Sequence, residues 1–268
     1  MPVLFPFICI SAVLDIVVCL NSNYTDAMLA LMLVVWFAVF FLACVLALLC
    51  LMVLLSLFID PKKPQKTRSP FFCAFAKYLL GVLSAFARVR IHISGKDKIP
   101  QGRWLMVSNH RSGFDPVLTI WAMRKYDLAF VAKPSILRIP VIGRFVHKIC
   151  CLAIDRENDR AALKTILAAA ELMKTDVTSF FIYPEGTRNT GSELLPFRNG
   201  AFKIAQKAKA PVVVMAVRNT DRIAKNFPWR RTDVYMDILE VIDAERVHEL
   251  KTSEIGDEVR RCLQRASV

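Results

Sequence analysis

The stretch WLMVSNHRSGFDP (Trp104–Pro116) decides the predicted fold, because an apolar run turns there into a polar loop. The first residues have the length and apolar content of a buried strand. His110 and Asp115 follow in a loop that contains Gly113, and Pro116 comes directly after the aspartate. Aspartate is favoured at a helix N-cap, and proline at the first helical position. The stretch therefore predicts a strand, a polar loop, and a helix with Asp115 as its N-cap.

Apolar runs of strand length alternate with helix-like segments through the rest of the chain. The further runs are LAFVA, CLAI, SFFIY, PVVVMAV and VYMDILEVI. Helices are expected over 116–125, 134–147, 159–175 and 199–209. Such alternation is typical of an α/β domain with a largely parallel sheet flanked by helices.

Two polar motifs directly follow predicted strands. SNH comes after WLMVS, and PEGTR comes after SFFIY. In open α/β sheets, ligands bind in the crevice outside the carboxyl ends of the strands. We therefore expect both motifs at one edge of the sheet.

The first 59 residues have the composition of a membrane anchor. No lysine or arginine occurs from Val3 to Ile59, and the only charged residues there are two aspartates. Ala27–Ile59 is long enough to span a bilayer with tilt, and Val3–Leu20 is a second, weaker candidate. We therefore expect residues 1–59 to form an N-terminal membrane anchor of one or two transmembrane helices.

Basic residues and aromatic side chains follow the anchor. DPKKPQKTR comes directly after Ile59, and the positive-inside rule then places the following domain on the cytoplasmic side. Phe71, Phe75, Leu79 and later apolar residues recur at the helix period. Such a helix suits the interface of a membrane or a protein core equally well. We expect residues 60–90 to be a basic linker and an amphipathic interfacial helix, and residues 91–268 to be the main domain.

His110 and Asp115 suit the deprotonation of a hydroxyl group. A neutral imidazole accepts a proton near neutral pH, and a carboxylate on its other nitrogen stabilises the imidazolium that forms. A cap aspartate beside an unrelated histidine is an equally simple interpretation. A metal site is disfavoured, because the pair supplies only two ligands and the other histidines do not have the sequence spacing of metal ligands. No metal and no resident cofactor are expected.

The PEGTR motif has the residue types of an anion site. Gly186 allows the backbone to approach a ligand closely, while Thr187 and Arg188 offer a hydroxyl and a guanidinium that suit phosphate. Lys133, after LAFVA, adds another cationic group at a strand end. The alternative without a ligand is a surface ion pair between Glu185 and Arg188, which would contribute little to folding stability.

Charge and cysteine usage restrict the function classes. All 36 basic residues follow Ile59, and the net charge is +13. The basic residues accompany a membrane anchor and no nucleic-acid recognition motif, so nucleic-acid binding is disfavoured. The eight cysteines have no CxxC or zinc-site spacing. We therefore interpret them as small apolar side chains of a protein in a reducing compartment.

Four ordered blocks resemble the family of glycerolipid acyltransferases that includes 1-acyl-glycerol-3-phosphate acyltransferases. NHRSGFDP resembles the NHx4D motif of that family, AKPSILRIPVIGRF its second motif, YPEGTR with LLPFRNGAF its third, and APVVVMAV its fourth. The resemblance covers about residues 90–220. Ser135, Cys150 or Cys151, and Asn189 depart from residues that are frequent in the family.

The resemblance implies an enzyme with a defined reaction. It makes residues 91–268 a cytoplasmic acyltransferase domain that transfers a fatty acyl group from acyl-ACP or acyl-CoA to the sn-2 hydroxyl of lysophosphatidic acid. Phosphatidic acid would form without an acyl-enzyme intermediate, in phospholipid biosynthesis at a membrane. Glycerol-3-phosphate or another lysophospholipid as acceptor, and a non-catalytic phospholipid-binding protein, stay open as alternatives.

The resemblance also implies roles for particular residues. His110 would be the general base and Asp115 its partner. The acceptor phosphate would lie among Lys133, Thr187 and Arg188, with Gly186 in the turn. The role of Glu185 stays open between positioning the acceptor and holding the loop together. The implied partners are membrane lipids and the acyl carrier protein or coenzyme A that carries the donor.

Overall fold

The computed structural model describes residues 26–61, 63–191 and 193–266, together with 9–10, 12–13 and 16–17. Two thirds of the second candidate span, Val3–Leu20, lie outside the described residues, so that prediction is not tested. The chain divides into two compact units, Met1–Asp60 and Pro61–Val268. The boundaries expected at residues 59 and 90 stay predictions.

The first unit contains one long apolar helix, α2 (Asp26–Leu57). Its segment Met28–Leu57 is the one helix among the described residues that is long and apolar enough to cross a membrane. At about 1.5 Å rise per residue, a helix of this length exceeds the ~30 Å hydrocarbon core of a bilayer. This is weak support for membrane association.

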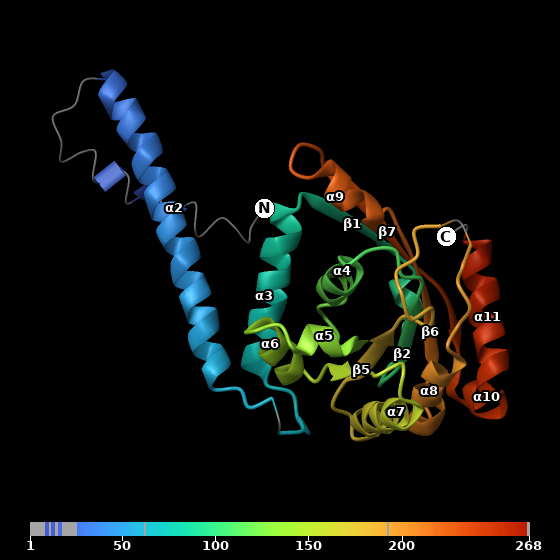
Figure 1. The fold of residues 1–268 in the computed structure, drawn as a ribbon. Helices are drawn as coiled ribbons and strands as arrows, with labels where there is room; N and C mark the ends of the chain where they lie inside the picture. The colour runs from blue at the N-terminus through green and yellow to red at the C-terminus, as the bar shows by residue number, and fades with distance from the viewer. Residues whose placement is uncertain are drawn as a thin grey trace. The chain divides into compact units, whose positions relative to one another are not determined.

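Seven strands of the second unit form one sheet in the order β1-β7-β6-β2-β5-β3-β4 (Figure 1). All neighbouring pairs are parallel except β6 with β7, so the largely parallel sheet of an α/β fold is confirmed. The strands are β1 (Val89–Ser94), β2 (Leu105–Ser108), β3 (Leu128–Ala132), β4 (Leu152–Ala153), β5 (Ser179–Ile182), β6 (Val212–Arg218) and β7 (Thr232–Ile242).

The central strands are buried on both faces, which explains why their sequences are apolar without interruption. Leu105 and Val107 of β2 pack into the core on one face, and Met106 packs into the core on the other. Helices cover the sheet: α3 (Pro70–Phe86), α4 (Asp115–Ala122), α5 (Pro134–Leu137), α6 (Ile142–Lys148), α7 (Asp159–Lys174), α8 (Lys203–Ala208), α9 (Ile223–Asn226), α10 (Ala244–Glu249) and α11 (Thr252–Arg265), with 3-10 turns η1 (Lys96–Lys98), η2 (Asn199–Phe202) and η3 (Thr220–Arg222).

The helix expected over 134–147 is broken, so that prediction is wrong in detail. α5 ends at Leu137 and α6 begins at Ile142, with Pro140 between them. Proline has no backbone N–H to continue the helix and restricts the residue before it. Val141 follows with a φ of +64°, which turns the chain between the two short helices.

α3 packs within the second unit and also leaves apolar side chains exposed. Cys73, Gly81 and Ser84 are its buried residues, and Gly81 faces the Trp121 ring so closely that a Cβ there would lie 2.7 Å from it. Phe71 and Phe86 on the same helix stay exposed. The buried side of α3 agrees with the core-packing interpretation, and the interfacial interpretation stays a prediction.

The parallel register brings the polar motifs to one edge of the sheet. Val107 of β2 pairs with Ile182 of β5, and Phe181 pairs with Phe130 of β3. The loops that follow these three strands consequently leave the sheet side by side at its carboxyl edge. This edge carries the candidate site.

Candidate active site

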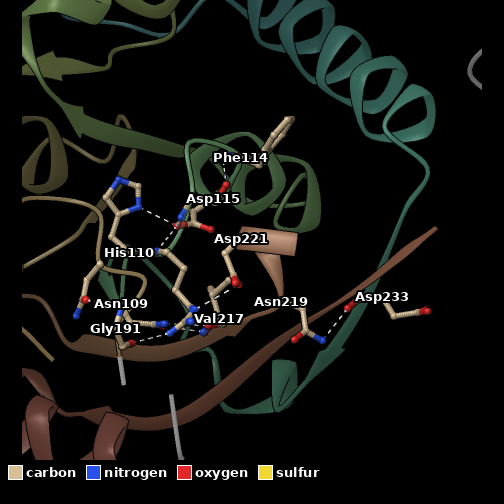
Figure 2. A network of polar contacts seen from close by, with 12 residues as sticks. Asn109, His110, Phe114, Asp115, Gly191, Val217, Asn219, Asp221 and Asp233 are labelled. Carbon is tan, nitrogen blue, oxygen red and sulfur yellow. Dashed lines mark hydrogen bonds and ion pairs between the residues drawn. The ribbon is translucent and has the colours of Figure 1, made fainter. Parts of the chain in front are cut away.

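The His110 imidazole and the Asp115 carboxylate face each other within one loop (Figure 2). Nδ1 of His110 lies 2.8 Å from Oδ2 of Asp115. The carboxylate is fully buried, while 15% of the imidazole side chain is exposed. A carboxylate acceptor requires the proton on Nδ1, which leaves the Nε2 lone pair available. The pair can therefore accept a proton from a hydroxyl group that reaches Nε2.

Asp115 is the first residue of α4 and not its N-cap, so the cap prediction is wrong. The N-cap position belongs to Phe114. The Asp115 Oδ2 accepts hydrogen bonds from the backbone N–H groups of Arg111 (2.7 Å) and Ser112 (2.8 Å), which lie before the helix. The carboxylate thus folds back to organise the loop and holds the imidazole with the same oxygen.

Three buried oxygens near the pair have no hydrogen-bond partner of ordinary geometry among the described residues: Asp115 Oδ1, Thr119 Oγ1 and the Tyr183 hydroxyl, the last two being close enough to influence each other. The Tyr183 ring stacks on the His110 ring with centroids 3.9 Å apart. Burial and the nearby Asp115 charge hold the pKa of the Tyr183 hydroxyl well above its usual range, and the Thr119 hydroxyl acts in the opposite direction. Tyr183 is therefore neutral, and its ring fixes the plane of the imidazole from below.

Asn109 ties the histidine loop to the adjacent strand. Its Nδ2 donates to the Val217 carbonyl and its Oδ1 accepts from the Val217 N–H, both at 2.8 Å. Two hydrogen bonds from one buried amide fix the direction in which the chain leaves β2 (Figure 2).

Glu185 joins the two motif loops. One of its carboxylate oxygens accepts from the His110 N–H at 3.1 Å. The other accepts from Asn189 Nδ2 at 2.9 Å and from the Leu195 N–H at 3.0 Å. A backbone bond of 2.6 Å from the Asn189 N–H to the His110 carbonyl adds to this connection. Glu185 is 5% exposed, and its carboxylate oxygens hold the loop together.

Glu185→Gln is expected to lower the free energy of unfolding by about 1–3 kcal/mol, because an amide NH2 would face a backbone donor in a buried position. Thermal unfolding of the purified variant measures this loss. Glu193→Gln, an exposed position in the same loop, is the matched control and should leave stability unchanged. Wild-type stability in Glu185→Gln, combined with a changed KM for the acceptor, would assign the residue to acceptor positioning instead.

Gly186 allows two arginines to approach the turn. Its φ is +73°, a conformation that side chains with a Cβ rarely adopt. A Cβ there would lie 3.2 Å from Arg198 and 3.8 Å from Arg156. Burial lowers the pKa of Arg156, and the charge of Arg198 adds to this effect. Neither guanidinium has a carboxylate partner among the described residues, so this pair adds uncompensated positive charge beside the turn.

The predicted phosphate residues lie at the same edge with free polar groups. Arg188 reaches the histidine loop, because its Nη1 lies 3.6 Å from a Cβ built on Gly113. Thr187 and Arg188 are exposed after β5, and Lys133 is exposed after the neighbouring strand β3. Within the described part of the chain, none of these three side chains has a hydrogen bond or ion pair.

A cavity of about 410 Å³ opens beside the turn and is bordered by Tyr183 and Gly186. Its other lining residues combine an apolar wall with basic groups: Val131, Ile154, Arg156, Asp159, Ala162, Leu163, Ile166, Ile182, Pro184, Arg198, Gly200, Ala201 and Lys203. Such a lining suits an amphiphile with an anionic group.

Some of these residues were not predicted from the sequence. Lys133 was selected because it follows the strand β3, and ligands bind at the carboxyl ends of the strands. Arg156 follows β4, so the same argument would also have selected Arg156. Nothing local in the sequence distinguishes Arg198 or the stacking of Tyr183. No group of three metal-ligating side chains occurs among the residues described.

The chain is similar to known acyltransferases. The family model described as "Acyltransferase" matches residues 90–218. A curated relative from Saccharomyces cerevisiae, named 1-acyl-sn-glycerol-3-phosphate acyltransferase, is 28% identical over 189 residues, covering 69% of this chain and 62% of the relative. A relative of the same name from Haemophilus influenzae is 32% identical over 151 residues, covering 54% of this chain and 62% of the relative. The chain thus spans less than two thirds of the length of these two proteins.

A solved structure shares the fold. The crystal structure of the 1-acyl-sn-glycerophosphate (LPA) acyltransferase PlsC from Thermotoga maritima superposes with a TM-score of 0.58 at 22% identity, covering 81% of this chain and 86% of that chain. The architecture of sheet and helices is therefore one already seen in a solved protein.

Proposed function

Since the acyltransferase family model matches residues 90–218 and the chain is similar to 1-acyl-sn-glycerol-3-phosphate acyltransferases, we propose that it acylates the sn-2 hydroxyl of lysophosphatidic acid to form phosphatidic acid. The observation that carries the proposal is the His110–Asp115 pair, 2.8 Å apart, with Arg188 over the same loop. A proton acceptor and an anion-binding group then lie within reach of one small acceptor molecule.

His110 acts as the general base. Its Nε2 takes the proton of the acceptor hydroxyl as that oxygen attacks the thioester carbonyl carbon. The tetrahedral intermediate collapses with cleavage of the carbon–sulfur bond, and the imidazolium returns the proton to the departing thiolate. Asp115 stabilises the imidazolium in between, because its carboxylate is buried against Nδ1. No acyl-enzyme forms, since the acceptor oxygen is itself the nucleophile.

The acceptor phosphate binds among Lys133, Thr187 and Arg188. Their side chains are exposed at the carboxyl edge, and two of them are cationic. Holding the phosphate fixes the hydroxyl near Nε2, and orientation of this kind supplies a large part of the rate enhancement in acyl transfer. Arg156 and Arg198 raise the positive potential at the turn and favour an anionic acceptor.

The reaction takes place at a membrane. α2 anchors the chain, and the basic residues that follow Ile59 keep the second unit on the cytoplasmic face. The membrane supplies the lipid acceptor, and the donor is the thioester of acyl carrier protein or coenzyme A. The chemistry requires no resident cofactor, because the thioester is already activated.

Arg188→Ala and Lys133→Ala are expected to weaken the use of phosphorylated acceptors selectively. Loss of one cation from the phosphate site corresponds to about 2 kcal/mol, or roughly 30-fold in kcat/KM. The measurement compares lysophosphatidic acid with monoacylglycerol, which has the hydroxyl and lacks the phosphate. Lys207→Ala, on the opposite edge of the sheet, is the control.

An equal loss for both acceptors would remove Lys133 and Arg188 from the phosphate site. The same assay extended to glycerol-3-phosphate and other lysophospholipids tests the proposed acceptor, and faster acylation of any of these would replace lysophosphatidic acid in the proposal.

A further inference from the structure

A cluster of exposed aromatic side chains lies where α3 ends and β7 begins. Phe86 is 59% exposed, Phe227 is 38% exposed and Trp229 is 85% exposed. The rings of Phe86 and Phe227 are in contact, with centroids 5.3 Å apart. We call Phe86, Phe227 and Trp229 the aromatic surface. Exposed aromatic residues gathered in this way mark an interaction site.

Hydrogen bonds hold the aromatic surface in place. Arg88, just after α3, donates from Nη1 to the carbonyl of Pro228 at 3.1 Å and to that of Trp229 at 3.2 Å. The Arg230 N–H donates to the Asn226 carbonyl at 2.7 Å. The backbone around Trp229 is thus fixed to the second unit, while its indole ring extends into the surroundings.

The aromatic surface lies at the same edge of the sheet as the candidate active site. Val89 of β1 pairs with Thr232 of β7, so the starts of both strands adjoin (Figure 1). β7 runs antiparallel to β6, and its Tyr235 pairs with Arg218 at the end of β6. Since β6 is parallel to β2, the start of β7 lies at the carboxyl edge. β7 is two strand spacings from β2, about 10 Å.

Basic residues border the aromatic surface. Arg230 and Arg231 follow Trp229 directly, and Lys225 precedes Phe227; all three are exposed. Asp233 lies 3.7 Å from Arg231 in an ion pair and offsets one of these three charges, which leaves the border of the aromatic surface positive. Tryptophan favours the headgroup level of a bilayer, and phenylalanine is common on the apolar face of segments that lie in the interface. Adjacent arginines favour anionic lipids.

Chain connectivity limits the distance between α2 and the second unit. α2 ends at Leu57, and residues 58–69 lead to α3 at Pro70. Fully extended, such a connection spans at most about 40 Å. If α2 crosses a bilayer, the second unit cannot move far from the bilayer surface.

We propose that the aromatic surface, with Arg230 and Arg231, inserts into the interface of an anionic bilayer. It forms a second attachment besides α2 and holds the carboxyl edge of the sheet against the headgroups. A lipid acceptor would then reach the candidate site without leaving the membrane. The proposal concerns attachment alone and does not depend on which reaction the site performs.

Fluorescence of Trp229 in full-length protein reconstituted into vesicles tests the proposal. The spectrum of Trp229→Phe is subtracted from that of the wild type, which isolates Trp229 from the other tryptophans. In vesicles of zwitterionic lipid with added anionic lipid, we expect this difference emission to be shifted to the blue. Lipids brominated near the carbonyl end of the acyl chains should quench it at least about twofold, because the indole lies at headgroup level.

Charge variants test the anionic preference. Arg230→Gln/Arg231→Gln should lower the quenching in anionic vesicles and change it little in zwitterionic ones. Lys174→Gln/Lys207→Gln removes two exposed charges at the opposite edge of the sheet and should change neither.

Trp229 emission that stays at the wavelength of water-exposed indole, with quenching by aqueous iodide and none by bromine, would overturn the proposal. Shielding from iodide without quenching by bromine would also overturn it, since it would indicate burial against a second copy or another protein. The measurement uses no substrate, so its result is separate from that of any activity assay.

Discussion

Replacing His110 by alanine is expected to lower the rate of acyl transfer by about 10³–10⁴-fold, because no other described group is placed to take the hydroxyl proton. The side chain makes one hydrogen bond, to Asp115, and stacks on Tyr183. Its removal therefore costs little packing, and the variant should fold and reconstitute like the wild type. The measurement is kcat/KM with lysophosphatidic acid and an acyl thioester.

Two controls separate chemistry from folding in that experiment. Thermal unfolding of His110→Ala should follow that of the wild type closely. His110→Gln retains a polar side chain without a basic nitrogen and should be as inactive as His110→Ala. Activity within tenfold of the wild type in either folded variant would remove His110 from the role of general base.

Asp115→Asn is expected to be nearly as severe, with a loss of about 10³-fold or more. The backbone N–H groups of Arg111 and Ser112 both point at the Asp115 carboxylate, so the amide oxygen of an asparagine would remain with them. Because the same oxygen also accepts from Nδ1 of His110, the amide oxygen would keep that hydrogen bond too, and the NH2 group would take the place of Oδ1. The imidazole would keep its tautomer, but the negative charge that stabilises the imidazolium would be lost.

Asp221→Asn is the matched control for this change, because Asp221 contacts the same loop through Arg111 at 3.5 Å and is half-buried. Its activity should stay near that of the wild type. Asp115→Asn with unimpaired kcat would show that the carboxylate only shapes the loop. Asp115 would then not be the residue that assists His110 as a base.

The central strands and the motif loops could be predicted because their sequence signals are local. β2 and β5 are buried on both faces and read as short apolar runs, each followed by polar residues. β1 was not predicted, since it lies at the edge of the sheet and alternates apolar with polar residues directly after a helix. Its alternation is a strand signal that the helix pattern of the preceding residues obscured.

The parts of the candidate site that escaped prediction depend on contacts between distant segments. Glu185 lies three residues before Arg188 and was considered as an ion partner of that arginine. The Glu185 carboxylate oxygens instead accept hydrogen bonds from His110, Asn189 and Leu195. The contact of the Asp115 carboxylate with His110 was expected, but the residue was placed at the N-cap, and the hydrogen bonds from the Arg111 and Ser112 N–H groups were not predicted. Which partner a side chain contacts here depends on how the loops are arranged in the folded protein.

The release of free thiol from an acyl thioester, with and without lysophosphatidic acid, tests the central claim most directly. The account predicts that the full-length protein releases one thiol for each phosphatidic acid formed, releases none when the acceptor is omitted, and loses this activity in His110→Ala. Stoichiometric thiol release without an acceptor would indicate an acyl-enzyme and contradict the mechanism. No acceptor-dependent release with either the coenzyme A or the acyl carrier protein thioester would contradict the proposed function itself.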